Sequence, residues 1–389
     1  MSGLASDKLA TRAARFVEAA VAHARALHPA PLAPDVARLH RLFTSERSER
    51  RPDYMRDPVL RRAYLGFFLP HNAVKLALLL ERARAEGLLR AADRPLVVDV
   101  GAGPLTGLFG TWIAFGHLGP ALAVDATAAT MAAAAPLLES IEHEGVETRV
   151  ANLSVDPPDR WLAGRRPDLI VLANVLNELR DPRRGTDLRE RLLAALVAGL
   201  APEGRLLVVE PATRVHGRAL MGVRDRLVAT RTASVLSPCR GAQACPLLRS
   251  HGDWCHGEHA WTPPRIYSEL ARAAGIDKGM LKESHLLLAP RSAPEQHAGL
   301  RLVGGPMRDR EGVERRYGCG TSGLVTLGGR PALPAAIGGA ARGALLNPVP
   351  PGLTAELKPS RAPGARGGRR GAAKAPRGRA RGAGAPRPR

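Results

Sequence analysis

Apolar positions recur every three or four residues in the first part of the chain, as they do in amphipathic helices. The stretches LATRAARFVEAAVAHARALH and AYLGFFLPHNAVKLALLLERARAEGLL follow this pattern, and between them lie a Pro-rich break, HPAPLAP, and an irregular basic segment, residues 37–58. We therefore predict an N-terminal helical region over residues 1–92. We expect its aromatic side chains Tyr64, Phe67 and Phe68 to pack against the main domain rather than to stack on bases.

From residue 93 the helical period gives way to short apolar runs that alternate with helix-forming sequence. The runs are PLVVDV, ALAVDAT, TRVANLSV, PDLIVLA and GRLLVVEPAT. Strands that alternate with helices form a parallel sheet with right-handed crossovers, and ligands of such sheets bind beyond the carboxyl ends of the strands. This predicts an α/β fold with a doubly wound, mostly parallel sheet over residues 93–230.

The first run ends in DVGAGPLTG, which is typical of a nucleotide-binding turn. Gly101 and Gly103 lack a Cβ, so the backbone can adopt positive φ and approach a ligand closely. A dinucleotide fingerprint would need glycine at Thr106. With Asp99 before the glycines, the turn better resembles the [DE]-x-G-x-G-x-G pattern of S-adenosylmethionine-dependent methyltransferases, although Leu105 occupies the third glycine position. The alternative is a tight turn without a ligand.

Polar side chains at the ends of the later strands are further candidates for holding this cofactor. Asp125 lies ~20 residues beyond the glycines, where a carboxylate can accept both hydroxyls of a ribose; alternatively, it caps the following helix. Strand order places Asn152 near the adenine, and Asn174 and Glu210 follow the fourth and fifth strands. We expect Asp99, Gly101, Asp125, Asn174 and Glu210 to converge on one edge of the sheet.

The sequence supports cofactor binding better than methyl transfer. The motif that usually positions an exocyclic amine, [DNS]-P-P-[YF], is replaced after the fourth strand by Ala173, Asn174, Val175 and Leu176. The α/β segment also lacks the cysteine that attack on carbon-5 of a pyrimidine requires. We therefore assign no catalytic residues.

Three of the four cysteines cluster in SPCRGAQACPLLRSHGDWCHGEHAW, within a cysteine-rich segment over residues 231–262. They are Cys239, Cys245 and Cys255, and the fourth is Cys319. Clustered thiols in a cytoplasmic protein indicate metal ligation or catalysis, and four thiolates hold either zinc or an iron–sulfur cluster. The CxxC knuckles usual for zinc are absent. Three nearby histidines could replace a ligand, bond to cluster sulfur or bind phosphate: His251, His256 and His259.

The remaining segments complete the α/β domain and add charge. We expect residues 263–330 to contribute a helix and strands that extend the sheet and return the fourth cysteine to the others. Residues 331–389, rich in Pro, Gly, Ala and Arg, are expected to be a disordered basic tail. The net charge of +21 and pI near 11.2 favour a polyanionic partner, with nucleic acid as the default. A solvated basic surface with a tail of no selected role is the alternative.

The hydropathy pattern gives no sign of a membrane span or of the apolar core of a signal peptide. We therefore expect a cytoplasmic protein, the Arg-rich start being the one feature that resembles a transit peptide.

Taken in order, DVGAGP, NVLNEL, VVEPATRVHGRAL, PCRGAQACP, DWCH and a late GC resemble the methyltransferase-like protein of the mitochondrial small ribosomal subunit and its bacterial relatives. The resemblance covers roughly residues 54–328. It implies a class I methyltransferase-type Rossmann fold that binds S-adenosylmethionine, and binding to small-subunit rRNA during ribosome assembly or translation. It also implies a [4Fe-4S] cluster held by the four cysteines, and family members likewise lack an obvious catalytic motif.

The leading hypothesis is therefore an iron–sulfur, rRNA-binding protein of methyltransferase fold that acts on the small ribosomal subunit and is a monomer when off the ribosome. One alternative is an active rRNA methyltransferase. Another is a zinc-stabilised RNA-binding module with a vestigial cofactor pocket.

Overall fold

The computed structural model describes residues 2–51, 53–89, 94–143, 145–179, 187–277, 279–293, 298–329, 332–350 and 353–357. They belong to one compact unit, Met1–Lys358.

An eight-stranded sheet forms the centre of this unit, with the order β3-β2-β1-β4-β5-β8-β6 and with β7 paired to β8. The first five strands run parallel, whereas β8 is antiparallel to both β5 and β6. The strands are β1 (Val97–Val100), β2 (Ala121–Asp125), β3 (Glu147–Val150), β4 (Leu169–Ala173), β5 (Arg205–Pro211), β6 (Ser234–Ser237), β7 (Gly257–Ala260) and β8 (Met280–Ala289). The doubly wound, mostly parallel sheet predicted from the sequence is confirmed.

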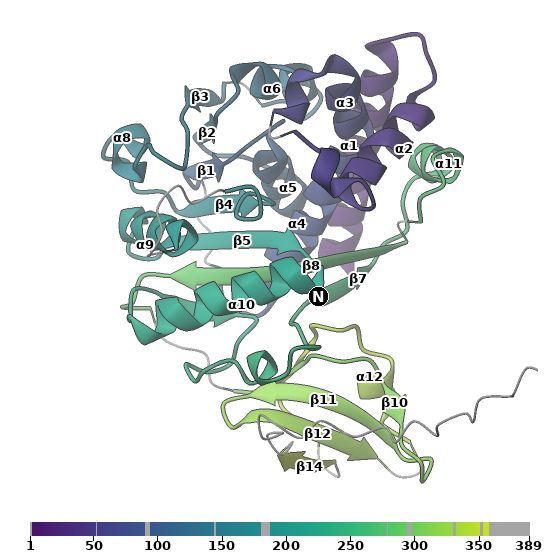
Figure 1. The fold of residues 1–389 in the computed structure, drawn as a ribbon, viewed down its shortest axis with the longest axis vertical. Coiled ribbons are helices and arrows are strands. Elements are labelled where there is room, and N and C mark those ends of the chain that lie inside the picture. Colours follow the sequence, from purple (N-terminus) through teal and green to yellow (C-terminus); the bar gives the residue numbers. More distant parts are fainter. Residues whose placement is uncertain are drawn as a thin grey trace, which may run out of the picture. The chain divides into compact units, whose positions relative to one another are not determined.

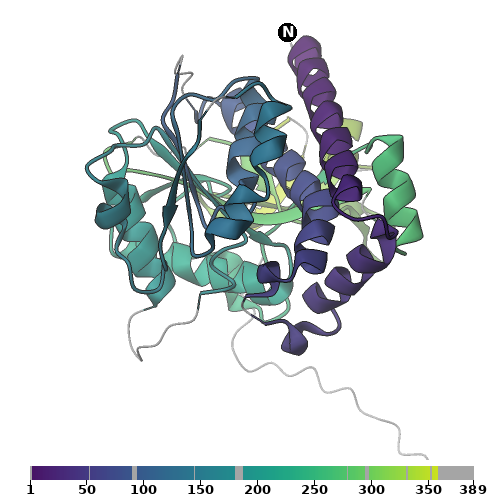
Figure 2. The ribbon, with the colours of Figure 1, turned by 90° about the horizontal axis from the view of Figure 1, so that it is seen from above.

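Helices cover both faces of the sheet (Figure 1). One face carries α1 (Ser2–Ala26), α2 (Leu32–Phe43), α3 (Pro58–Ala63), α4 (Leu69–Ala85), α5 (Thr106–Phe115), α6 (Ala128–Ala132), α7 (Ala135–Glu139) and α11 (Arg265–Ala273). The other carries α8 (Pro158–Leu162), α9 (Leu188–Gly199) and α10 (Arg214–Ala229). Because successive strand residues point to opposite faces, neighbours such as Val97 and Val98 enter different cores. Figure 2 shows α1 running beside α11.

The N-terminal region is helical, but its Pro-rich break is shorter than the sequence suggests. Helix α2 begins at Leu32, so Pro34 lies in its first turn, where the missing N–H costs no helical hydrogen bond. The segment after α2 contains two short 3₁₀ turns, η1 (Arg47–Glu49) and η2 (Tyr54–Arg56).

The N-terminal aromatic side chains are packed as expected. A π-helical turn, η3 (Tyr64–Phe68), precedes α4 and buries Phe67, whose ring stacks on Tyr267 of α11 with centroids 4.7 Å apart. The stretch Pro58–Ala85 is long and apolar enough to span a membrane, yet 89% of its most apolar window is buried inside the protein. It is thus a core helix of this fold.

A second sheet, all antiparallel, follows the first and corrects the predicted role of residues 263–330. Its order is β13-β9-β11-β12-β14, with β10 paired to β11. Its strands are β9 (Leu300–Leu302), β10 (Met307–Arg308), β11 (Glu314–Gly320), β12 (Gly323–Gly329), β13 (Leu345–Leu346) and β14 (Thr354–Leu357). Of the predicted C-terminal strands, only β8 joins the first sheet; the others bury a small core of their own around Leu302 and Leu327.

The predicted start of the disordered tail, residue 331, is also too early. Helix α12 (Ala335–Gly338) packs Ile337 into the core of the second sheet, and β14 pairs with β12. These elements are short and rich in Ala and Gly, so their apolar periodicity is too weak to be recognised in the sequence. Residues 358–389, with most of the predicted basic tail, lie outside the described residues.

Candidate functional site

The predicted cofactor residues lie at one edge of the first sheet. Val100 of β1 pairs with Val124 and Leu172, so the turn after β1 lies between the ends of β2 and β4. The other strand ends fall at the same edge: Asp125 ends β2, Asn152 follows β3, Asn174 follows β4, and Glu210 lies near the end of β5. The convergence predicted from strand order is confirmed, while the role of these residues as cofactor ligands stays a prediction.

The two glycines of the turn meet different constraints. Both have positive φ, +65° at Gly101 and +51° at Gly103. A Cβ on Gly101 would lie 2.4 Å from Cγ2 of Val175, so packing within the protein requires glycine there. A Cβ on Gly103 would have no atom within 4 Å. Gly103 is therefore the place where a ligand can approach the backbone.

Leu105 adopts the left-handed conformation, φ 63° and ψ 36°, that a glycine would take at this position. Its side chain is buried in the core shared with the N-terminal helices. A buried leucine thus compensates for a strained backbone, which is rare for a residue with a large side chain.

Gly107 is required for a different reason, the approach of Asp99. The backbone N–H groups of Gly107 and Leu108 donate to Oδ2 of Asp99 at 2.7 and 3.3 Å, and a Cβ on Gly107 would lie 2.5 Å from Oδ1. Burial raises the pKa of Asp99 to about 8, against the opposing effect of those two hydrogen bonds. Asp99 therefore anchors the first turn of α5 from beneath.

Asp125 joins the glycine turn to the end of β2. Its Oδ2 accepts from the N–H of Gly103 and its Oδ1 from that of Thr127, both at 2.9 Å. Burial raises the pKa of Asp125, and its backbone hydrogen bonds oppose this. A carboxylate has about four acceptor sites, so acceptor capacity remains for a ribose hydroxyl.

The two asparagines differ in setting. Asn152 is exposed and its Oδ1 accepts from Ser154 N at 3.0 Å. Asn174 has φ 61°, and its backbone carbonyl accepts a hydrogen bond from Nδ2 of Asn177 at 2.8 Å. The chain therefore turns sharply at the end of β4, at the point where a cofactor crevice opens in this class of sheet.

Buried Glu210 holds the loop after β4. Its two carboxyl oxygens accept from the N–H groups of Leu176 and Asn177 at 2.9 and 3.1 Å. Burial raises the pKa of Glu210 to about 7. Beside it, burial and nearby arginines, Arg47 first, lower the pKa of His216 to about 4, so this imidazole is neutral at pH 7.

An N-terminal strap, residues 44–51 and 53–57, contributes residues to this edge that the sequence patterns do not indicate. Arg50 donates to Oε1 of Glu178, in the loop after β4, at 2.8 Å. Its guanidinium lies 5.4 Å from the ring centroids of both Phe43 and Tyr54. Contacts between distant segments leave no local hydropathy pattern. The sequence of the strap therefore shows no helical or strand periodicity.

At a second site, all four cysteines line one pocket of about 40 Å³. This volume is larger than the volume that one water molecule requires. Cys239 follows β6, Cys245 precedes the 3₁₀ turn η4 (Pro246–Arg249), Cys255 precedes β7, and Cys319 lies in β11 of the second sheet. Helix α10 and strand β8 supply other walls, including Met221 and His285. The predicted return of the fourth cysteine to the first three is confirmed, by a route through a separate sheet.

The four cysteines are free thiols. Burial, with the mutual proximity of the sulfurs, raises the pKa of Cys245 to about 11 and that of Cys319 to about 12. The same causes raise the pKa of Cys255 well above its ordinary value. Within the described ranges, no group of three or more His, Cys, Asp or Glu side chains is arranged to hold a single metal ion. The three nearby histidines, His251, His256 and His259, are not among the described residues that line the pocket.

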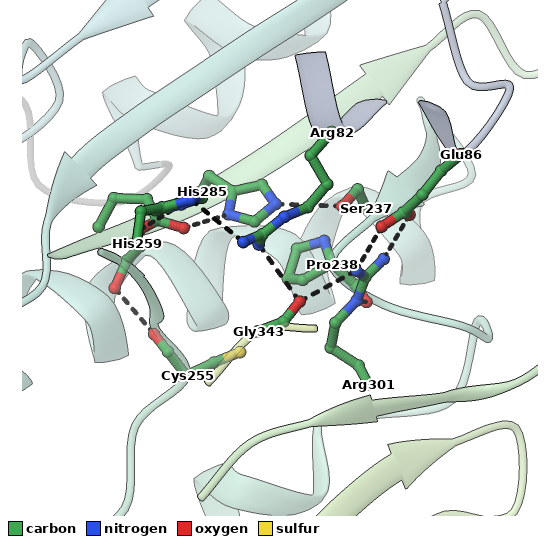
Figure 3. Close-up of polar contacts among 11 residues, drawn as sticks. Arg82, Glu86, Ser237, Pro238, Cys255, His259, His285, Arg301 and Gly343 are labelled. Atoms are coloured by element: carbon green, nitrogen blue, oxygen red, sulfur yellow. Dashed lines mark hydrogen bonds and ion pairs between the residues drawn. The ribbon is translucent and has the colours of Figure 1, made fainter. Parts of the chain in front are cut away.

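A buried polar network borders the cysteine pocket (Figure 3). Glu283, fully buried, accepts from His285 Nδ1 at 3.2 Å and lies 3.3 Å from His259 Nε2; His285 Nε2 lies 3.1 Å from Ser237 Oγ. The two imidazoles hold the pKa of Glu283 well below its usual range although burial opposes them. This network joins β6, β7 and β8 behind the cysteines.

Arg301 ties the second sheet to the first in the same region. Its guanidinium forms a two-pronged pair with Glu86, at 2.7 and 2.8 Å, and donates to the carbonyls of Pro238 and Gly343 at 3.1 Å each. The wall between Cys239 and β9 is therefore held by a buried arginine whose charge is neutralised.

Comparison with known proteins identifies the family. The family model described as "Mitochondrial small ribosomal subunit Rsm22" matches residues 92–309, more than half of the chain. The chain belongs to the Rsm22 family. The match includes Cys239, Cys245 and Cys255 and ends before Cys319. No curated protein matches the chain.

Two methyltransferases are among the solved structures that match this chain. Magnesium protoporphyrin IX methyltransferase from Synechocystis PCC 6803 has 11% identity and a TM-score of 0.34, over 57% of this chain and 83% of that one. Precorrin-6y C5,15-methyltransferase from Geobacter metallireducens GS-15 has 13% identity and a TM-score of 0.31, over 53% and 84%. Neither activity is assigned to this chain at such identities. The sheet itself, with antiparallel β8 between β5 and β6, has the class I methyltransferase order.

Proposed function

We propose that this Rsm22-family chain binds the RNA of the small ribosomal subunit, in assembly or translation, and carries a [4Fe-4S] cluster on Cys239, Cys245, Cys255 and Cys319. The observation that carries the proposal is that every cysteine of the chain lines one pocket, although Cys319 comes from a different sheet. Four independent thiols would have no reason to converge.

The pocket fits such a cluster in its donor set and its surroundings. Four thiolates are the ligands of a cubane cluster, which takes one from each cysteine. Arg224 lines the pocket, and its buried Nε has no hydrogen-bond partner in the described part of the chain. When bound, the cluster would supply an electron-transfer or structural centre that joins α10 to the second sheet.

The edge of the first sheet at Gly103 and Asp125 fits S-adenosylmethionine by the same kind of test. Gly103 leaves space beside its Cα, and the carboxylate of Asp125 keeps acceptor capacity next to it. We propose that these two residues, with Asp99 and Gly101 shaping the turn and Asn152 and Asn174 flanking it, hold the cofactor. Methyl transfer is not part of the proposal, because no residue at this edge of the sheet has an assigned catalytic role.

The first test is the visible spectrum and the metal content of protein purified without oxygen. We expect a brown protein with a broad band near ~400 nm and about four irons per chain. The Cys245→Ser variant should lose the colour and unfold at a lower temperature than the parent protein. A colourless protein that contains zinc would contradict the cluster and favour the zinc-stabilised module.

The second test is binding to isolated small ribosomal subunits by co-sedimentation. Since the chain has a net charge of +21, we expect binding that weakens steeply as salt rises. Equal binding to large subunits would contradict the proposed partner. Methyl transfer to small-subunit rRNA in the same mixture would favour the active methyltransferase instead. The protein would then be found in the compartment of its ribosome, which we expect to be the cytoplasm. We expect it to be a monomer when it is not bound to the ribosome.

Binding of S-adenosylmethionine is tested separately by calorimetry. Asp125→Asn should weaken binding by about tenfold or more, the effect of losing a charged hydrogen-bond acceptor. Asp159→Asn, at an exposed position in α8, is the control and should bind as the parent protein does.

A further inference from the structure

The loop between Cys239 and Cys245 is held by a buried arginine from helix α10. Arg224 is 3% exposed, and its guanidinium donates to the backbone carbonyls of Gly241 and Gln243. Its charge is balanced by Asp225, whose Oδ1 lies 2.7 Å from Nη1 of Arg224. A guanidinium presents donors in a rigid fork, so it can hold two carbonyls at once, which a lysine ammonium does with less geometric precision.

The next residue of the same helix holds the far end of this loop. The backbone N–H of Cys245 lies 3.1 and 3.0 Å from the two carboxylate oxygens of Asp225. Arg224 and Asp225 therefore set the path of the chain from the first cysteine to the second through backbone groups alone.

The loop in turn reaches the strand that carries the fourth cysteine. Nε2 of Gln243 donates to the carbonyl of Gly320 at 2.7 Å, one residue after Cys319. A Cβ on Gly241 would lie 2.3 Å from Oε1 of Gln243 and 3.3 Å from Cα of Thr321, so glycine lets the loop close on this turn. One side chain thus links the first sheet's cysteine loop to the second sheet.

We propose that Arg224, Asp225 and Gln243 are positioning residues that bring the four thiols together before any cluster is inserted. Arg224 and Asp225 form the Cys239–Cys245 half, and Gln243 brings Cys319 to it. The purpose of this arrangement rests on the proposed [4Fe-4S] site, but the contacts of these three residues involve no thiol. The cluster then binds a preformed pocket and need not pay the entropy of closing the long loop between Cys255 and Cys319.

Proximity of the thiols in the metal-free full-length protein can be measured with dibromobimane, which fluoresces only after both its arms react with neighbouring thiols. The chain has four cysteines, so every cross-link reports on this pocket. Mass spectrometry then identifies which pairs are joined. We expect cross-links in the parent protein that include Cys319.

Gln243→Ala should lower the yield of cross-links to Cys319 about fivefold, the effect of one lost hydrogen bond on an equilibrium. It should leave the Cys239–Cys245 pair unchanged, which general destabilisation would not do. Arg224→Met and Arg224→Lys should lower both the yield of cross-links to Cys319 and the yield of the Cys239–Cys245 cross-link. Arg226→Met is the matched control on α10, because Arg226 is 43% exposed and pairs with Glu190.

Unchanged Cys319 cross-links in Gln243→Ala, or equal loss of all pairs in every variant including the control, would overturn the proposal. Should Arg224→Met fail to fold, Gln243→Ala, whose side chain is only half-buried, still decides. Iron uptake is measured on the same samples. A parent protein that cross-links as expected but takes up no iron and sulfide would disprove the cluster while leaving the preformed pocket supported.

Discussion

At the scale of single residues, Leu105 combines two opposing effects. Its left-handed backbone costs roughly 1–2 kcal/mol relative to glycine, while its buried side chain stabilises the core by more. Leu105→Gly and Leu105→Ala should both lower the free energy of unfolding, but the glycine variant should be the more stable of the two by about 1 kcal/mol.

Urea denaturation checks this order, with Leu193 as the control. Leu193 is fully buried in the middle of α9, where alanine is the better helix former, so Leu193→Ala should be more stable than Leu193→Gly. The same order at both positions would contradict the strain at Leu105.

Asp99 should make stability depend on pH in an unusual direction. Its pKa is about 8 in the folded protein and about 3.9 in an unfolded chain, so between these values only the folded state holds the proton. The contribution of Asp99 is therefore present at pH 4 and is lost as the pH rises towards 8. Unfolding measured from pH 5 to pH 8 should show the parent losing stability relative to Asp99→Asn, and parallel curves would contradict this.

The residues at the sheet edge show what the sequence can and cannot reveal. Asp99, Asp125 and Asn174 could be placed together because parallel strands end at one edge, so order along the chain determines position. Their acceptor bonds could not be predicted, since Asp125 uses both oxygens on backbone N–H groups of neighbouring turns. Such bonds depend on turn geometry that residue types alone do not specify.

At the scale of elements, the first sheet was predictable because four of its first five strands are short apolar runs and each of the five is followed by a helix. The second sheet was not, because four of its six strands are only two to four residues long and charged residues such as Arg301 and Arg316 interrupt its apolar positions. Both arginines are buried in the structure. The sequence does not distinguish a buried, paired arginine from a solvated one. It therefore gave no sign that strand β9 belongs to a second sheet rather than extending the first.

The strap is the element whose stability we expect a single ion pair to control. Arg50→Met removes the pair with Glu178 and the contact of a cation with two rings, each worth about 1 kcal/mol or less. Hydrogen exchange of the amides of Arg56 and Asp57, which bond within η2, should quicken several-fold while the sheet exchanges as before.

Arg41→Met is the control for this experiment. Arg41 pairs with Glu46 at 3.0 Å near the same segment, but it is 51% exposed and no ring contact is recorded for it in the described structure. It should leave the exchange of Arg56 and Asp57 unchanged. A similar increase in both variants would mean that the strap responds to any lost charge.

At the scale of the whole molecule, positive charge is concentrated at the end of the chain. Residues 359–389 hold ten Lys and Arg residues and no Asp or Glu, whereas the net charge of the full chain is +21. If the protein binds ribosomal RNA, each arginine that neutralises a phosphate should add about 0.7 to the slope of log affinity against log salt, the value for single strands. The family match and the cysteine pocket lie outside this segment, so its deletion leaves the folded unit intact.

Deleting residues 359–389 should therefore flatten the salt dependence of small-subunit binding by several units of slope and weaken binding most at low salt. Iron content and thermal melting should not change. A full set of co-sedimentation curves from low to high salt, for parent and truncated protein, measures both effects. An unchanged slope would locate the phosphate contacts on the folded unit, and the arginines of the strap, Arg47 and Arg50, would then be the first to replace.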